Sequence, residues 1–333
     1  MVELYDRKKQ ANWPELIGRC AVSLILVLLT QCTQFLVPHF FSDSYFFIQL
    51  LLSALILLAV ASAAGWCRRL LRVRSSAPAF VFCSVLFVWL VYMAVVRQDA
   101  SLLMNLLFNG QIILLIFGLC RMLSSDPGLG SYSSSPSDAV SQSFVLEIDT
   151  HHQETDILMS NPYLGRLTEA DIGLGDRLRR CPICKRYVKG FDHHCPAFGN
   201  CIGHKNYVLF IVLLFGFIWT EATYICLSQY SAKSGLLGGD GTRLEVIFSR
   251  KVARSTMLFS IQQLVWQVAF FLWHVYCICF NIRTDEWIHW KRYPEFQIVV
   301  QSEQGQRSSE MKFRNPYDKG VLQNVKEFMA SKQ

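Results

Sequence analysis

The chain has 333 residues, of which 52% are hydrophobic and only 17% are charged, and its formal net charge is +7. Soluble domains carry about a quarter charged residues, so this composition excludes an ordinary soluble globule. A nucleic-acid-binding role is also disfavoured, because no basic run lies on a separate soluble domain. The positive charge instead fits Lys and Arg residues that flank the cytoplasmic ends of membrane helices.

Six apolar blocks predict membrane-spanning helices, because each approaches the roughly 20 residues that a helix needs to cross the hydrocarbon layer. They are Ile17–Pro38, Tyr45–Trp66, Ala79–Val96, Leu102–Cys120, Tyr207–Gln229 and Met257–Phe280. The sequence therefore predicts an all-α polytopic membrane protein. In the fourth block, Asn105 and Asn109 are four residues apart and share a helix face. We expect that face to point into the bundle, where amides bond across helices.

The distribution of basic residues predicts the orientation. Residues 68–74, between the second and third blocks, hold four arginines, whereas residues 38–44, between the first and second, hold no Lys or Arg. The positive-inside rule then puts both termini and the loop 121–206 in the cytosol. One connection, residues 230–255, disagrees because it would be lumenal. It nevertheless carries five basic residues, namely Lys233, Arg243, Arg250, Lys251 and Arg254.

This topology divides the chain into four parts. Residues 1–120 hold an N-terminal tail and four transmembrane helices, and residues 121–206 form a cytosolic loop with a small cysteine-rich domain. Residues 207–281 hold two transmembrane helices with a lumenal connection, and residues 282–333 form a cytosolic tail. Within the loop, the Ser-rich stretch Ser131–Ser137 predicts a flexible linker.

Four of the twelve cysteines lie within 21 residues: Cys181, Cys184, Cys195 and Cys201. A Cys-x-x-Cys pair supplies two thiolates for one tetrahedral zinc, and one histidine and a further cysteine complete a closed structural site. The segment contains one cysteine and one histidine more than a single zinc needs. This surplus suggests a nucleophile and a base beside the metal site.

Asp192, His193 and Cys195 have the parts of an activated thiol site. An imidazole can take the proton of the thiol, and a carboxylate can hold that imidazole in one tautomer. Because neighbouring side chains on an extended strand point apart, we expect the backbone to turn here. The residues alone favour equally a purely structural zinc knuckle with Cys195 as a bystander.

The run from Asp192 to Pro196, followed by Asn200-Cys201-Ile202-Gly203, resembles the DHHC protein S-acyltransferases, also called palmitoyltransferases. Three weaker motifs extend the resemblance over residues 121 to 328. They are Asp126-Pro127-Gly128 after a membrane helix, Arg283-Thr284-Asp285-Glu286 after the last helix, and Asn315-Pro316-Tyr317-Asp318 with Asn324 in the tail. The resemblance implies an enzyme of endomembranes, in the ER or Golgi, with its site facing the cytosol.

The resemblance also implies the mechanism and the partners. Cys195 would attack long-chain acyl-CoA and pass the acyl group to cysteines of membrane-associated proteins, with Asp192 as orienter and His193 as base. The transmembrane bundle would house the acyl chain in the lipid bilayer. The implied zinc ligands are Cys181, Cys184, His194 and Cys201. Two other hypotheses stay open: a catalytically weak zinc-binding scaffold and, less favoured, a metal transporter.

The sequence departs from the family in several places. The family usually has a second zinc site, but here no cysteine occurs between Cys120 and Cys181, and two of its ligand positions are Arg180 and Tyr187. We therefore expect one zinc, with Arg180 and Tyr187 holding the strand by packing and hydrogen bonds. Ala197 replaces the family's usual Trp, and Arg283 replaces a Thr.

Several other residues allow both a functional and a plain interpretation. Basic residues crowd the loop and would meet either CoA phosphates or anionic lipid: Arg166, Arg177, Arg179, Arg180, Lys185, Arg186, Lys189 and Lys205. Glu221 lies inside the fifth block, where a carboxylate is costly and often functional, although a neutral or paired residue is favoured. Gln262, Gln263 and Gln267 predict interhelical hydrogen bonds. Val321, Val325 and Phe328 predict a short amphipathic helix.

Overall fold

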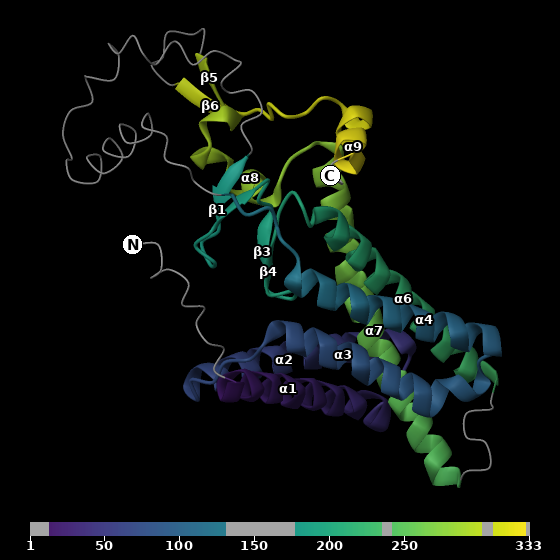
Figure 1. The fold of residues 1–333 in the computed structure, drawn as a ribbon. Helices are drawn as coiled ribbons and strands as arrows, with labels where there is room; N and C mark the ends of the chain where they lie inside the picture. The colour runs from purple at the N-terminus through teal and green to yellow at the C-terminus, as the bar shows by residue number, and fades with distance from the viewer. Residues whose placement is uncertain (1–12, 131–176, 235–241, 302–308, 331–333) are drawn as a thin grey trace. The chain divides into compact units, whose positions relative to one another are not determined.

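The computed structural model describes residues 13–130, 177–234, 242–301 and 309–330 (Figure 1). The predicted linker Ser131–Ser137 and Arg166 lie outside these ranges. The predicted helical membrane architecture is confirmed, because six helices are long and apolar enough to cross a membrane. They are α1 (Trp13–Phe40), α2 (Phe46–Leu70), α3 (Ala77–Val91), α4 (Leu102–Ser124), α6 (Tyr207–Ser234) and α7 (Arg243–Cys279).

Local signals set where two of these helices begin. At the start of α3, the Ser76 side chain accepts a hydrogen bond from the Ala79 backbone N–H at 3.4 Å, and Pro78 occupies the first turn. Ser101 does the same for α4 through the N–H of Met104. Both are N-terminal caps that satisfy a backbone donor left free by the helix. Between these helices α3 continues through a π-helical turn, Tyr92–Val96.

The chain forms two compact units, which are described separately. The helical unit comprises Met1–Ser125, Cys195–Asn200 and Leu209–Tyr276. The cysteine-rich unit comprises Asp126–His194, Cys201–Val208 and Cys277–Gln333.

Hydrogen bonds between helices confirm the expected inward face of α4. Trp89 of α3 donates its indole N–H to Oδ1 of Asn109 at 2.9 Å, and the Tyr92 hydroxyl bonds to Oδ1 of Asn105. Gln262 of α7 likewise donates to the hydroxyl of Ser53 in α2 at 2.6 Å. Such contacts hold membrane helices together where no hydrophobic force between them exists.

Helix α7 begins at Arg243, well before the predicted start at Met257. The predicted connection 230–255 was therefore too long, because helix continues through its basic residues. Arg254 explains how one charge is accommodated: its Nε donates to Oε1 of Gln49 at 2.7 Å, and its guanidinium lies over the ring of Phe46. A prediction from hydropathy places the boundary of a membrane helix where charged residues begin. Here polar partners on α2 allow helix α7 to extend past that boundary.

Short strands and helices make up the cysteine-rich unit. Strand β1 (Leu178–Arg180) pairs antiparallel with β2 (Tyr187–Lys189), and β5 (Gln297–Gln301) pairs with β6 (Ser309–Phe313). Strands β3 (His193–Cys195) and β4 (Asn200–Ile202) form a third pair, which continues into the helical unit. Two helices, α8 (Thr284–His289) and α9 (Val321–Ala330), complete the unit. The predicted tail helix is thus confirmed.

Side chains of α9 fix it to the ends of two membrane helices. Asn324 donates to the backbone oxygen of Cys279 at 2.8 Å, and Phe328 packs edge-on against Tyr207 with ring centroids 5.4 Å apart. Elsewhere in the unit, Gly203 allows a close backbone approach. A Cβ atom at this position would lie 2.3 Å from the backbone oxygen of Pro127, so no other residue fits without displacing the chain.

Candidate functional site: a metal-ligand cluster and a pocketed cysteine

The four predicted metal ligands come together in the cysteine-rich unit. One ligand atom from each of Cys181, Cys184, His194 and Cys201 lies within 4.8 Å of the others. Nδ1 of His194 is 3.3 Å from Sγ of Cys184 and 3.6 Å from Sγ of Cys201, and these two sulfurs are 3.6 Å apart. Tetrahedral zinc with usual bond lengths separates two sulfurs by about 3.8 Å and a sulfur from a nitrogen by about 3.5 Å. The donor set and its spacing therefore fit zinc.

Electrostatics favour a metal ion at this cluster. Burial raises the pKa of Cys184 and also that of Cys201, because a thiolate is poorly solvated there. Burial lowers the pKa of His194, with a further contribution from neighbouring His193. The histidine therefore remains neutral and able to ligate, and a divalent cation would compensate the thiolates.

The predicted carboxylate–imidazole pair is also formed in this unit. Oδ2 of Asp192 lies 2.7 Å from Nδ1 of His193, and the aspartate is fully buried. The other oxygen, Oδ1, accepts the backbone N–H of Thr284 at 3.0 Å, and the backbone oxygen accepts the N–H of Asp285 at 3.0 Å. The start of α8 thus holds Asp192 in place, so the ring of His193 has a fixed orienting partner.

The expected turn at these residues was wrong, because His193–Cys195 is strand β3. Side chains alternate along a strand, so residues two apart share a face. His193 and Cys195 therefore lie on one face of β3, and His194 lies on the other, where it joins the metal-ligand cluster. The alternation of side chains along the strand thus puts His193 and Cys195 on the face opposite to His194, the predicted metal ligand between them.

In the helical unit, Cys195 lines a cavity of about 180 Å³ between membrane helices. Its walls include Phe80 from α3, Phe210 from α6 and Phe270 from α7. Ala197, at the position where the resemblance leads one to expect Trp, also lines this cavity. The cysteine itself is buried, with 6% of its surface exposed.

Asn200 anchors the segment that carries Cys195 to the end of α4. Its side-chain amide donates to the backbone oxygens of Met122 at 3.0 Å and Ser125 at 2.9 Å. Gly199 has φ +58°, and a Cβ there would come within 3.0 Å of Pro78. The Asn and Gly of this loop therefore hold the segment that places Cys195 in the wall of the cavity.

An arginine clamp joins β1 to the C-terminal part of the cysteine-rich unit. The guanidinium of Arg177 donates to both carboxylate oxygens of Glu286, at 2.9 and 2.7 Å, and also to the side chain and backbone oxygen of Asn281. It stacks on the ring of Tyr317 at 3.8 Å. Glu286 is fully buried, so this is an internal ion pair.

A second clamp lies two residues further along the chain, within β1. Arg179 forms an ion pair with Glu295 and lies 4.0 Å over the ring of Tyr293. Arg180 stands opposite Tyr187 in the β1–β2 register, and both residues are exposed, so the expected packing of this pair stays a prediction. Arg177 and Arg179 are thus engaged within the protein, a role that their sequence context did not indicate.

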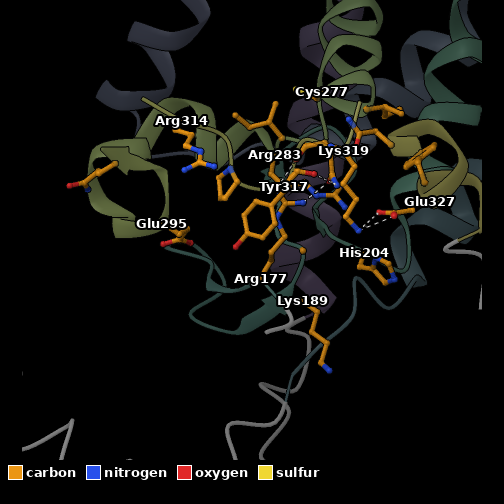
Figure 2. A pocket seen from close by; sticks show the side chains of 18 of the residues that line it. Arg177, Lys189, His204, Cys277, Arg283, Glu295, Arg314, Tyr317, Lys319 and Glu327 are labelled. Atoms are coloured by element: carbon orange, nitrogen blue, oxygen red, sulfur yellow. Dashed lines mark hydrogen bonds and ion pairs between the residues drawn. The ribbon is translucent and has the colours of Figure 1, made fainter. Parts of the chain in front are cut away.

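The cysteine-rich unit also contains a larger cavity of about 640 Å³. Figure 2 shows Arg177, Arg283 and Tyr317 together, with Lys319 bonded to Glu327 beside them. Arg283 is the residue that departs from the family's Thr, and its guanidinium lies over the ring of Tyr207 at 4.7 Å. Most of the charges lining this cavity are basic, and two of them, Arg177 and Lys319, form ion pairs with carboxylates of the same unit.

Comparison with known proteins adds to this geometry. Residues 171–291 match the family model described as DHHC palmitoyltransferase. The predicted family resemblance is confirmed. Because the matched region includes both the metal-ligand cluster and Cys195, the similarity concerns the candidate site itself.

Named relatives agree with this family. The chain is 26% identical over 273 residues to "Probable protein S-acyltransferase 3" of Arabidopsis thaliana, covering 77% of this chain and 59% of the relative. It is 25% identical over 167 residues to "Palmitoyltransferase ZDHHC17" of Homo sapiens, covering 46% of this chain and 24% of the relative. "Probable protein S-acyltransferase 15" of Arabidopsis thaliana is 25% identical, with 74% and 87% covered. The chain thus spans little more than half of the first relative and a quarter of the second.

Proposed function

We propose that this protein is a protein S-acyltransferase that moves a long-chain acyl group from acyl-CoA to cysteines of membrane-associated proteins through an acyl-enzyme on Cys195. The observation that carries the proposal is the position of Cys195. It lines an apolar cavity among membrane helices and follows His193 by two residues on the same face of β3. His193 in turn is hydrogen-bonded to a buried carboxylate. The family match and the names of the relatives support the same class of enzyme.

In the first step His193 takes the proton from the thiol of Cys195. The resulting thiolate attacks the carbonyl carbon of the acyl-CoA thioester, a carbon–sulfur bond forms, and the bond from that carbon to the CoA sulfur breaks. The CoA thiolate leaves and takes the proton from His193. Asp192 stabilises the imidazolium that forms in between and keeps the ring oriented.

The second step transfers the acyl group. A substrate cysteine gives its thiol proton to His193 and attacks the carbonyl carbon of the acyl-enzyme. The bond to Sγ of Cys195 breaks, and Cys195 regains the proton. The apolar cavity beside Cys195 would hold the acyl chain through both steps and exclude water, which would otherwise hydrolyse the thioester.

Cys181, Cys184, His194 and Cys201 would hold one zinc ion with a structural role. Because His194 lies between His193 and Cys195, ligation on one face of β3 would fix the orientation of the two side chains on the other. We also propose that the site and both termini face the cytosol, on the basis of the arginines between α2 and α3. The resemblance to the family favours the ER or Golgi as the membrane.

Intact-mass measurement of the purified protein with hexadecanoyl-CoA tests this function. We expect one acyl group per chain that is removed by neutral hydroxylamine and absent in Cys195→Ala. Cys67→Ala is the matched control, because Cys67 is an exposed cysteine outside the site. Loss of acylation only in Cys195→Ala supports the enzyme. Absence of acyl-enzyme in the wild type contradicts it and favours the zinc-binding scaffold.

A further inference from the structure

The larger cavity, of about 640 Å³, belongs to the cysteine-rich unit alone, because every residue that lines it is part of that unit. Small-molecule sites occupy about 300–1,000 Å³, so the volume suits a small ligand. Neither step of the proposed acyl transfer uses this cavity. Cys277 and Ile278 form part of its wall and lie in the last turn of membrane helix α7. The cavity therefore lies beside the end of a membrane span.

The charges that line this cavity do not cancel. Three ion pairs account for both acidic residues of the lining and for two of its basic residues: Glu327 with Lys319, Glu295 with Arg179, and Glu286 with Arg177. Arg283 and Arg314 also line the cavity (Figure 2). Neither of these two arginines has an ion-pair partner within the described ranges. The cavity thus has an excess of positive charge that the unit does not neutralise.

The protein satisfies Arg283 incompletely. Tyr207 attracts its guanidinium through the ring, whose centroid is 4.7 Å away, and through the hydroxyl. Nε of Arg283 is buried and has no hydrogen-bond partner in the described part of the chain. An aromatic ring attracts a cation but does not replace a counter-ion. An anion in the cavity would supply the negative charge that Arg283 lacks.

Arg314 presents a second guanidinium from a distant part of the sequence. Its backbone N–H donates to the oxygen of Phe296 at 2.9 Å, which fixes the position of the residue just after β6. Its side chain is exposed and makes no ion pair or hydrogen bond with any described residue. Guanidinium groups bind phosphate oxygens with two parallel hydrogen bonds. A phosphomonoester carries a charge of about −1.5 to −2 at neutral pH, which matches two arginines better than the single charge of a phosphodiester does.

The same cavity also has an apolar side. Ile278, Ile282 and Phe328 contribute to the wall, and α7 ends at Cys279, four residues before Arg283. Charged and apolar groups therefore meet where a membrane span ends. A phosphorylated lipid headgroup would find both kinds of contact there, whereas a soluble phosphate would use the arginines alone.

We propose that this cavity binds a phosphomonoester through Arg283 and Arg314, either on the headgroup of a phosphorylated membrane lipid or on a small soluble molecule. Cys195 does not line the cavity, so the inference goes beyond the proposed function. Binding should accordingly be the same in Cys195→Ala as in the wild type.

Native mass spectrometry of the purified full chain in detergent tests the proposal. The probes are phosphatidylinositol monophosphate, inositol monophosphate and coenzyme A, each compared with the compound that lacks the monoester: phosphatidylinositol, inositol and dephospho-coenzyme A. We expect at least one probe to bind about tenfold more tightly than its partner compound, the effect of a charge-assisted hydrogen bond. A difference confined to the lipid pair identifies a headgroup as the source, and one in either soluble pair identifies a free phosphate.

Variants test whether the two arginines carry the difference. Arg283→Gln and Arg314→Gln each remove one positive charge, and each should weaken binding of the preferred probe about tenfold to hundredfold. Binding of the compound without the monoester should not change. Arg292→Gln is the matched control, because Arg292 is exposed and does not line the cavity. If size exclusion shows that Arg283→Gln fails to fold, the exposed position of Arg314 lets its variant carry the comparison.

Three results would overturn the inference. The first is equal binding within all three pairs of compounds, and the second is undiminished binding of the preferred probe by the arginine variants. The third is an equal loss in Arg292→Gln, which would indicate general charge attraction rather than a site. All three leave the proposed function standing, because acylation of Cys195 is measured separately. Conversely, arginine-dependent binding without any acyl-enzyme would refute the proposed function and leave this site intact.

Discussion

Glu286→Gln should open the cysteine-rich unit, because it removes the only carboxylate that pairs with Arg177 among the described residues. In the native protein one carboxylate oxygen accepts Nε of Arg177, and the other accepts Nη2 and the backbone N–H of Arg283. The two side chains are 14% and 1% exposed, respectively. Burial lowers the pKa of Arg177, and the adjacent carboxylate of Glu286 opposes that shift. A glutamine of the same size would leave a buried cation without its counter-ion.

The expected cost is about 3–5 kcal/mol, the range for removing one partner of a buried ion pair. Hydrogen exchange followed by mass spectrometry measures it locally. Amides of residues 281–296 should exchange about 10²–10⁴-fold faster, since about 1.4 kcal/mol corresponds to a factor of ten. Glu327→Gln is the matched control, because it breaks an exposed pair with Lys319 that is worth at most about 1 kcal/mol.

A double variant sharpens this test. Replacing Arg177 by Met and Glu286 by Leu together removes the charges as a pair, so it should restore much of the protection that the single variant loses. Protection in Glu286→Gln that equals that of the control would refute the reasoning. It would mean that the hydrogen bonds from the guanidinium to Asn281, together with stacking on the ring of Tyr317, suffice to stabilise Arg177.

Three further predictions concern the site. Asp192→Asn should lower acyl-enzyme formation about 10²–10⁴-fold with unchanged zinc content, as single-turnover kinetics and metal analysis would show; equal rates would exclude its orienting role. Metal analysis should give one zinc per chain, reduced in Cys181→Ala, and two would contradict the expected loss of the second site. The pKa of His194 lies below its usual range. Zinc should therefore stay bound as the pH falls through about 6.5 and be released only in more acidic buffer. Release of zinc near neutral pH would argue against His194 as a ligand.

The positions of the membrane helices and of the metal ligands could be predicted because both depend on local sequence. Apolar length predicted six spans, and Cys-x-x-Cys spacing with His194 and Cys201 predicted a cluster that the structure brings together. The strand conformation of His193–Cys195 was missed, although alternation along a strand already places two alternate residues on one face. The start of α7 was missed because its N-terminal part is rich in basic residues, one of which, Arg254, finds partners on α2.

Pairs of residues that lie far apart in the sequence could not be predicted from local sequence patterns. Arg177 lies 109 residues before Glu286, and nothing in the local pattern relates them. Glu221 could be recognised as an unusual carboxylate in a membrane helix, but its place in the cavity of Cys195 depends on how α3, α6 and α7 pack. A polar residue deep in an apolar block was the available signal, and packing decides whether such a residue meets a partner or a pocket.

The two arginine clamps suggest how the cysteine-rich unit can dispense with a second zinc. A zinc ion ties several segments together at one point, and Arg177 and Arg179 tie β1 to Glu286 and Glu295 in the C-terminal part of the unit. Both guanidiniums also stack on tyrosines, which adds attraction that a bare ion pair lacks. Unlike thiolate ligation, these ties are insensitive to chelators and oxidants. Chelation should therefore loosen the strand that carries His194 while the arginine-linked part of the unit keeps its protection from exchange.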